Sequence, residues 1–361
     1  MPDNYHKMDK NCSKTPKNTC FYGFLNFLII LIYLFLVTQQ TFSHFRGLIT
    51  KTLIMRKFFF LILLCMSCSE GNDDTVVETV PDACANVAST YSIVLNSADC
   101  DVDIETTLGV SSQYDEQIVG GKRQISFNNI ANHSVGAFPR RGNPNTISAN
   151  NHTVEMTINP QASNTFTSAK GYDFGILFSG VAMDPFTAEF FMNGSQPNRS
   201  WNETALTSAV NLGTDCNNAH VQPSGEYHYH GTPNAFIDAL TNGQTPTSMI
   251  KLGYAADGFP IYYKYGYGSD DNLEVLESGY RLKEGSRPGD GITAPNGCYD
   301  GLYFQDYEYV SGISTLDEAN GRTGKTPDAN SEYYYVVTDN FPSSPIYFRG
   351  TPDASFKHGG P

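Results

Sequence analysis

The sequence predicts a mostly β protein, an antiparallel sandwich or barrel-like domain of many short strands with long loops. Two observations predict this fold class. The chain of 361 residues is rich in aromatic side chains that favour strands, with 22 Tyr and 23 Phe. It also contains 32 Gly and 19 Pro, and turn residues of this kind divide the Tyr-, Phe-, Val- and Thr-rich runs into short segments.

Several of these runs have the length and composition of strands. The predicted strands are residues 154–158, 174–178, 189–192, 226–230, 261–265, 303–309 and 332–338. Turn signals such as Asp257-Gly258 and Asn296-Gly297 lie between them. The sequence contains no Gly-rich phosphate loop, no Gly-x-Ser-x-Gly elbow and no His-Glu-x-x-His helix, which counts against the commonest hydrolase classes.

The N-terminal part of the sequence resembles an export signal with a lipid anchor. A first apolar run, residues 24–37, is short for a membrane span. A second run, residues 58–67, follows Met55-Arg-Lys57 and ends beside Cys68 in a stretch that resembles a bacterial lipobox. We therefore predict that residues 1–54 are an upstream over-extension or a signal anchor, and that 55–67 are a lipoprotein signal peptide. Lipidation of Cys68 would make the membrane a partner of an exported protein at the outer membrane or cell surface.

Charge is distributed unevenly along the chain. Residues 1–67 carry eight basic and two acidic side chains, whereas the remainder carries 15 basic and 35 acidic ones. An acidic body repels phosphate backbones, so we expect no nucleic-acid partner, and it suits cations. No motif identifies a protein or glycan partner. Residues 68–112 are predicted to form an acidic tether with a small disulfide loop.

Four cysteines lie beyond the signal region, and an even number in an exported chain indicates disulfides. Three pairings are possible. We favour Cys84–Cys100 as a local loop and Cys216–Cys298 as a long-range link, with free buried thiols as the alternative.

Residues 219–231 read Ala-His-Val-Gln-Pro-Ser-Gly-Glu-Tyr-His-Tyr-His-Gly and predict a β-hairpin. Pro223-Ser-Gly225 suits a three-residue loop, with Pro in a type I turn and Gly in the left-handed position. Such a loop pairs Gln222 with Glu226, and therefore His220 with His228. A four-residue loop would instead move His220 to the opposite face.

Alternation along the strands places His220, His228 and His230 on one face of this hairpin, and Tyr227 and Tyr229 on the other, toward the core. Three imidazoles on one face are the ligand set of a first-row divalent metal, Cu or Zn above all. Three protein ligands leave a position open for water or substrate. Glu226 shares the face as a fourth ligand or a catalytic base. The alternative is a ladder of surface histidines without metal.

Residues 216–231, including the tetrapeptide Tyr-His-Tyr-His, resemble the signature of the YHYH-domain family. Stretches at 184–189, 253–262, 305–309, 316–322 and 350–353 are similar to the same family. The resemblance covers about residues 115–356 and implies that 113–361 form a single YHYH domain. It implies an exported protein but no particular reaction.

Further residues are candidates for the site. His133 is a candidate fourth metal ligand, and Asp257 joins Glu226 as a catalytic candidate. The acidic candidates are Glu189, Asp306 and Asp317, to which the family resemblance adds some weight; carboxylates of this kind also suit Ca2+. If residues 303–309 form a strand, Asp306 and Glu308 share one of its faces.

Three functions are consistent with these observations. The first is a metal-binding protein at the cell surface. The second is a metal-dependent enzyme, a hydrolase or a copper oxidase, which requires a concave pocket at the His face with a carboxylate in reach. The third is an adhesion or carbohydrate-binding module that uses the Tyr-rich residues 262–268, which requires outward-facing tyrosines.

Overall fold

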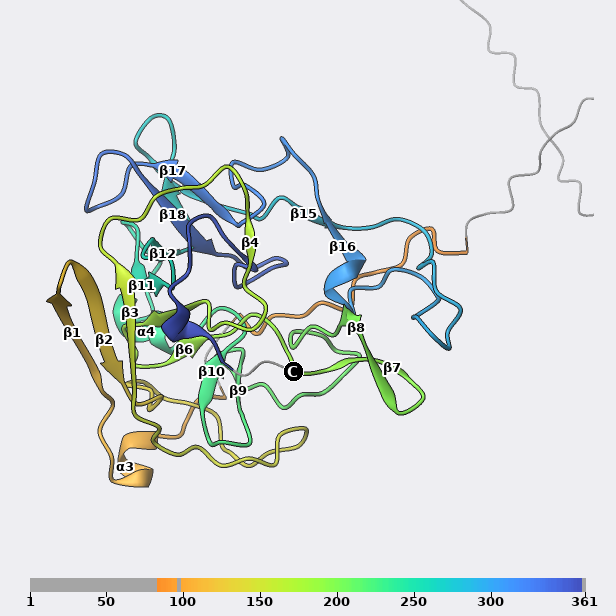
Figure 1. The fold of residues 1–361 in the computed structure, drawn as a ribbon, viewed down its shortest axis with the longest axis horizontal. Helices are drawn as coiled ribbons and strands as arrows, with labels where there is room; N and C mark the ends of the chain where they lie inside the picture. The colour runs from red at the N-terminus through yellow and green to blue at the C-terminus, as the bar shows by residue number, and fades with distance from the viewer. Residues whose placement is uncertain (1–82, 96–98, 359–361) are drawn as a thin grey trace, which may run out of the picture. The chain divides into compact units, whose positions relative to one another are not determined.

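The computed structural model describes residues 83–95 and 99–358, and its central element is an eight-stranded sheet (Figure 1). The strands of this sheet are β5 (Gly175–Leu177), β6 (Ala182–Met183), β9 (Ala219–Val221), β10 (Tyr227–Tyr229), β11 (Lys251–Ala255), β12 (Pro260–Tyr263), β17 (Gly321–Gly324) and β18 (Glu332–Val337). Their order across the sheet is β17-β18-β12-β11-β5-β6-β10-β9. The β9–β10 hairpin therefore forms one edge.

The prediction of a mostly β protein with many short strands is confirmed. Two features of the large sheet differ from the prediction of an antiparallel sandwich or barrel. β6 pairs with β10, and β12 with β18, in parallel, so the sheet is mixed. It also does not close into a barrel within the described residues, since β17 and β9 are both edges.

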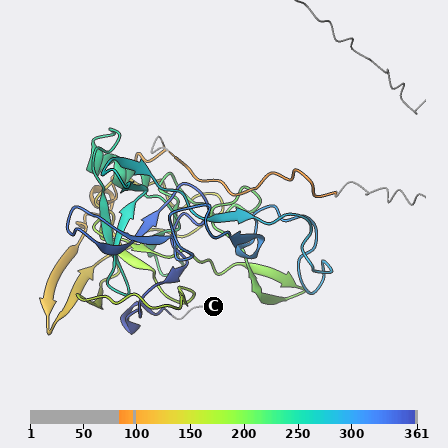
Figure 2. The same ribbon diagram turned by 90° about the horizontal axis from the view of Figure 1, so that it is seen from above.

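Smaller sheets surround the large one. A three-stranded sheet contains β1 (Tyr114–Val119), β2 (Lys122–Phe127) and β3 (His152–Thr157). The two-stranded pairs are β4 (Thr167–Ser168) with β19 (Tyr347–Phe348), β7 (Phe190–Asn193) with β8 (Gln196–Asn202), β13 (Tyr265–Tyr267) with β14 (Leu273–Val275), and β15 (Tyr280–Leu282) with β16 (Tyr307–Tyr309). Figures 1 and 2 show that β1–β2 and β7–β8 extend from opposite sides of the molecule.

Helices are few and short in the described part of the chain. They are α3 (Ile104–Leu108), α4 (Asn234–Thr241) and the 3-10 turns η1 (Phe304–Asp306) and η2 (Ala354–Phe356). η1 falls inside the predicted strand 303–309, so only the second half of that prediction, β16, is correct. The strand is interrupted because the Asp306 carboxylate turns back to accept from the N–H groups of Gly301 and Tyr303.

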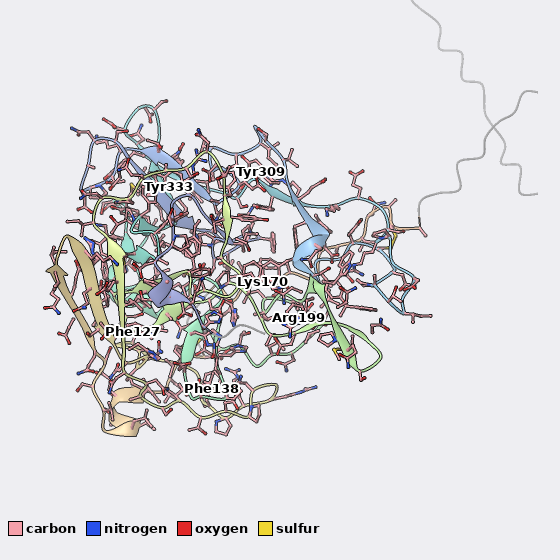
Figure 3. The ribbon with its side chains drawn as sticks, in the orientation of Figure 1. Phe127, Phe138, Lys170, Arg199, Tyr309 and Tyr333 are labelled. Carbon is pink, nitrogen blue, oxygen red and sulfur yellow. A yellow bond between two sulfur atoms is a disulfide. The ribbon has the colours of Figure 1, made fainter. Side chains whose placement is uncertain are left out.

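Aromatic rings fill the interior, as the composition predicts. Phe174, the residue directly before β5, stacks on Phe348 of β19 with ring centroids 4.9 Å apart. Tyr335 of β18 contacts the same Phe174 ring edge-on, also with centroids 4.9 Å apart. Edge-to-face and offset rings of this kind add to the burial energy. The side-chain view in Figure 3 shows how densely rings such as Tyr333 and Phe127 occupy the space between the strands.

The predicted domain boundary at residue 113 is wrong, because the preceding segment belongs to the folded unit. Residues 83–95 and 99–112 are not a tether. Tyr91 packs edge-on against Phe341, with ring centroids 5.5 Å apart, and Ile104 of α3 is part of the main core. Hydrogen bonds from Ser92 N to Leu206 O and from Val94 N to Asn218 Oδ1 hold the segment along the domain.

The favoured cysteine pairing is also wrong. Disulfides join Cys84 to Cys298 and Cys100 to Cys216. The reason is the same extended path, which carries the chain from the neighbourhood of residue 298 to that of residue 216. Cys84 and Cys100 therefore lie at opposite ends of one segment and cannot close a local loop.

The predicted leader, residues 1–67, and the lipidation site Cys68 lie outside the described residues. Within residues 83–95 and 99–358, no helix has the length and apolar character needed to cross a membrane.

Candidate metal site

The hairpin that carries the histidines has the predicted loop. Gly225 is in the left-handed conformation, with φ of 92°, and its N–H donates to the Gln222 carbonyl at 2.9 Å. Gln222 N donates in turn to Glu226 O at 2.9 Å. The three-residue loop therefore sets the register, and His220 of β9 lies directly opposite His228 of β10, as predicted.

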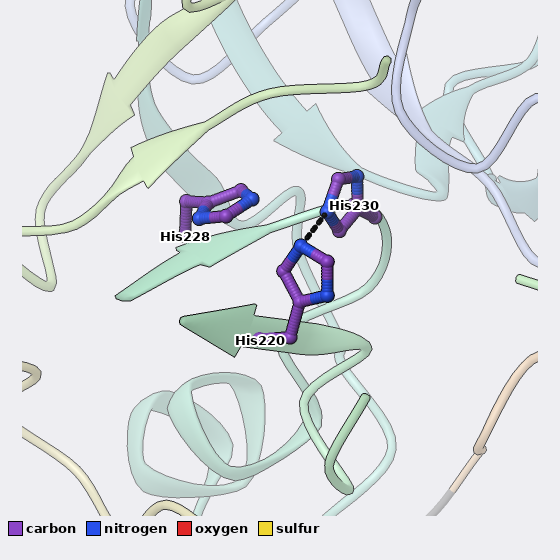
Figure 4. A group of neighbouring side chains, drawn as sticks. All are labelled: His220, His228 and His230. Atoms are coloured by element: carbon purple, nitrogen blue, oxygen red, sulfur yellow. Dashed lines mark hydrogen bonds between the residues drawn. The ribbon is translucent and has the colours of Figure 1, made fainter. Parts of the chain in front are cut away.

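The three imidazoles converge on one face of this hairpin (Figure 4). The ring centroids of His220, His228 and His230 are 4.6–4.8 Å apart, and the Nε2 atoms of His220 and His230 are separated by 3.0 Å. Two nitrogens that bind one Zn2+ tetrahedrally, at about 2.0–2.1 Å each, are about 3.3 Å apart. All three rings offer a nitrogen within 4.8 Å of the others, so small side-chain adjustments would complete a three-ligand set.

Burial keeps these imidazoles neutral, which is the form that binds metals. His228 and His230 are each 4% exposed, and burial lowers the pKa of His228 to about 3. Burial lowers the pKa of His220 and of His230 as well, the latter well below the usual value. The neighbouring histidines also lower the pKa values of His228 and His230, because two protonated rings at this distance would repel each other.

Backbone carbonyls orient two of the rings. His220 Nδ1 donates to the Leu212 carbonyl at 3.0 Å, and His228 Nδ1 lies 3.3 Å from the Glu226 carbonyl. A carbonyl partner requires a hydrogen on Nδ1, so in both rings Nε2 keeps its lone pair for a ligand. His230 Nδ1 is buried without a hydrogen-bond partner.

A buried polar network supports the opposite face of the hairpin. Tyr227 and Tyr229 are fully buried there, as predicted. The Tyr227 hydroxyl donates to Asp215 Oδ2 at 2.7 Å and accepts from Asn217 Nδ2 at 3.1 Å. Asp215 was not predicted to belong to the site, and the sequence signal nearest to it is the adjacent Cys216.

Two asparagines hold the outer edge of the hairpin. The amide groups of Asn143 and Asn145 both donate to the Val221 carbonyl, at 2.9 and 2.7 Å. β9 is an edge strand, so this carbonyl would otherwise have no partner in the sheet. Neither asparagine was predicted to belong to the site.

His133 does not join the histidine cluster, so the prediction of a fourth ligand is not supported by the geometry. Its Nε2 lies 2.6 Å from the Tyr229 hydroxyl and its Nδ1 donates to the Ser134 carbonyl at 2.9 Å. It is therefore on the tyrosine face of the hairpin, because Tyr229 alternates with the histidines. Burial lowers the pKa of His133 to about 4.

The His133 pKa predicts a pH dependence of stability. Between pH 6.5 and 4 the unfolded chain protonates His133, whereas the folded protein keeps the ring neutral. The stability that the neutral ring contributes above pH 6.5 is therefore lost as the pH falls toward 4. Between pH 7 and 5 the wild-type protein should lose about 2 kcal/mol more unfolding free energy than His133→Gln. Urea unfolding of both proteins at the two pH values measures the difference. Equal losses would contradict a neutral, buried His133.

Glu226 lies beside the cluster but is engaged elsewhere. Its Oε1 forms an ion pair with His152 Nε2 at 2.5 Å, and its Oε2 accepts from the Ser224 hydroxyl at 2.8 Å. The His152 partner lowers the pKa of Glu226, and Glu226 raises the pKa of His152. The carboxylate is thus not positioned as a fourth ligand or as a free base.

The histidine face opens into a cavity of about 820 Å³. Besides the three imidazoles, its walls include Glu189, Lys170, Asn145, Asp184 and His358. Lys170 donates to the Arg199 carbonyl at 3.1 Å, and the two residues lie close together in Figure 3. Of the predicted acidic candidates Glu189, Asp306 and Asp317, the cavity walls include Glu189 alone.

The other acidic candidates each have partners of their own, away from the cavity lining. Asp257 is buried and accepts from the Tyr335 hydroxyl and from Gly350 N, and burial raises its pKa to about 6. Arg287 donates to both carboxylate oxygens of Asp306, from Nε to Oδ1 at 2.8 Å and from Nη2 to Oδ2 at 2.6 Å. Asp317 accepts from Ala319 N and Gly321 N, which closes a turn. These contacts are those of structural carboxylates, and they do not gather into a Ca2+ site.

The comparisons with known proteins agree with the signature around the hairpin. A family model described as "YHYH protein" matches residues 153–350, which is more than half of the chain and includes the whole histidine cluster. Searches of curated proteins and of solved structures found no match. The chain belongs to the YHYH protein family.

Proposed function

We propose that this YHYH protein binds a first-row transition metal, Cu or Zn, through His220, His228 and His230. The observation that carries the proposal is the convergence of three neutral imidazoles on the open side of a hairpin. The Nε2 atoms of His220 and His230 are 3.0 Å apart, and backbone carbonyls at Nδ1 leave Nε2 of His220 and His228 free to bind a metal. A face of solvated surface histidines would not require such burial or such a network beneath it.

The metal would serve a protein outside the cytoplasm. Two disulfides that join distant parts of the chain are typical of an oxidising compartment. The proposal therefore includes export and a lipid anchor on Cys68 at the outer membrane or cell surface. Labelled palmitate, incorporated by the wild type but not by Cys68→Ala, tests the anchor.

A metal-dependent enzyme is the second candidate, and the cavity favours it. A concave site of about 820 Å³ at the histidine face, with the carboxylates of Glu189 and Asp184 in its walls, is what catalysis at this face requires. A bound ion would supply Lewis-acid polarisation there. Glu189 could hold or accept a proton, and Lys170 could orient an anionic group of a ligand.

The adhesion alternative has less support. Tyr262 is fully buried, and Tyr263, Tyr265 and Tyr267 are partly buried. Tyr263 and Tyr265 also contact each other edge-on, with ring centroids 5.6 Å apart. The Tyr-rich loop therefore does not present a flat row of exposed rings for stacking on sugars.

Metal content of purified protein tests the proposal. After loading with Cu2+ or Zn2+ and desalting, His228→Ala should retain about one equivalent less metal than the wild type, because it loses one of three ligands. His152→Gln is the matched control, since this histidine neighbours the hairpin but lies outside the cluster, and it should retain the wild-type content. Circular dichroism checks that each variant is folded. Equal metal content in wild type and His228→Ala would refute the metal site.

A further inference from the structure

A second cluster of potential ligands lies in the wall of the same cavity. Asp173, Asp184 and His358 each offer a ligand atom, and these atoms lie within 4.8 Å of one another. They come from three segments that are distant in sequence: one precedes β5, one follows β6 and one follows η2. None belongs to the histidine hairpin.

Backbone pairing brings the three segments together. Phe174 N donates to Met183 O at 2.7 Å, which places the residue before β5 beside the residue after β6. Asp173 N donates to Phe356 O at 3.0 Å, and Tyr172 forms a β-bridge with Lys357. The final described residues are thus fixed against the start of β5, and the cluster follows from the fold rather than from loose side chains.

The protein supplies one imidazole to balance the two carboxylates of this cluster. Asp184 is 5% exposed and lies beside a second carboxylate, Asp173. Among the described residues, no Lys or Arg forms an ion pair with either of them. His358 Nε2 forms an ion pair with Asp184 Oδ2 at 3.3 Å, which leaves Asp173 without a charged partner of its own in the described part of the chain. Two neighbouring carboxylates in a buried place are costly without a cation.

We propose that Asp173, Asp184 and His358 form a second divalent-cation site, distinct from the histidine triad. Two carboxylates and one imidazole are a harder ligand set than three imidazoles. Carboxylates suit Mn2+ and imidazole suits Zn2+, so the mixed set takes a borderline ion of this kind, Mn2+ or Zn2+. The remaining coordination positions face the cavity, to which Asp184 and His358 both contribute.

The two sites are neighbours in the sheet. β6 pairs in parallel with β10, and Asp184 N donates to Tyr229 O at 2.9 Å, one residue before His230. Asp184 thus connects the second site with β10, which leads directly into His230 of the triad. A ligand in the cavity could contact ions at both sites, one held by imidazoles and the other mainly by carboxylates. The second site does not require that the triad be occupied.

Mn2+ binding followed by electron paramagnetic resonance tests the proposal, because the free ion gives a strong signal that is lost on binding. We expect the full chain and His228→Ala to bind Mn2+ with similar affinity. Asp173→Asn and His358→Gln should each bind it at least about tenfold more weakly. Asp173→Asn is nearly isosteric, and its thermal unfolding beside that of the wild type shows that the fold is intact.

The outcomes separate the two sites. Wild-type affinity in both Asp173→Asn and His358→Gln, or no Mn2+ binding by the wild type, would overturn the second site. Loss in His228→Ala as well would overturn its independence from the triad. The triad is tested separately by the Cu2+ content, which should fall in His228→Ala and stay at the wild-type level in Asp173→Asn and His358→Gln.

Discussion

Replacing Asp215 with Ala is expected to lower the free energy of unfolding by about 3–5 kcal/mol. Asp215 is 1% exposed, and its carboxylate accepts from the Tyr227 hydroxyl at 2.7 Å, Gly136 N at 2.8 Å and Asn217 N at 2.9 Å. Removal of the carboxylate leaves these buried donors without partners. Guanidinium unfolding of the wild type and Asp215→Ala measures the loss.

The same substitution should weaken metal binding at the histidine triad, because Asp215 supports the opposite face of the hairpin. The Asp215 carboxylate also accepts from Ala219 N at 3.4 Å, at the first residue of β9, and this contact is lost in Asp215→Ala. Tyr227→Phe is the matched control, because it removes one hydroxyl and leaves the carboxylate with its backbone donors. It should cost only about 1–2 kcal/mol. An Asp215→Ala protein within 1 kcal/mol of the wild type would show that the network does not support the hairpin.

The histidine triad could be predicted because its determinants are local. The loop Pro223–Gly225 fixes the strand register, and alternation along the strands then fixes which side chains share a face. Every residue in that argument lies within eleven positions of the chain. The tyrosine face could be predicted for the same reason.

The rest of the site depends on contacts between distant segments, which one sequence does not reveal. Asp173 and His358 meet only because β5 and the residues after η2 pair across the domain. Asp184 was visible as part of a family-like stretch, but nothing in the sequence connects it with His358. His133 could have been assigned to either face, and the partner that decides its place is Tyr229.

The predictions that failed assumed local structure where the chain forms long-range contacts. The short spacing of Cys84 and Cys100 favoured a loop, but each of the two cysteines is joined to a distant part of the chain. Asp306 was placed on a regular strand, but its ion pair with Arg287 and its bonds to nearby N–H groups favour a 3-10 turn. The parallel pairing of β6 with β10 is likewise a property of the assembled sheet.

Removal of the Cys100–Cys216 disulfide is the second change with a large expected effect. The bond closes a loop with a sequence separation of 116 residues, inside the wider loop closed by Cys84–Cys298. The outer bond already restricts the unfolded chain, so the inner one constrains a shorter effective loop. The paired substitution Cys100→Ala with Cys216→Ala should still lower the free energy of unfolding by about 4 kcal/mol. Guanidinium unfolding under non-reducing conditions measures it.

The location of this disulfide links its loss to function. Cys216 lies beside Asp215 and Asn217, both of which contact Tyr227 beneath the histidines. The loss of the link should therefore weaken metal binding at the triad, whereas Cys84→Ala with Cys298→Ala, which removes the bond farther from the hairpin, should leave it unchanged. Mass spectrometry of non-reduced peptides checks the pairing itself. A peptide that joins Cys84 to Cys100 would contradict the structure and remove the basis for both expectations.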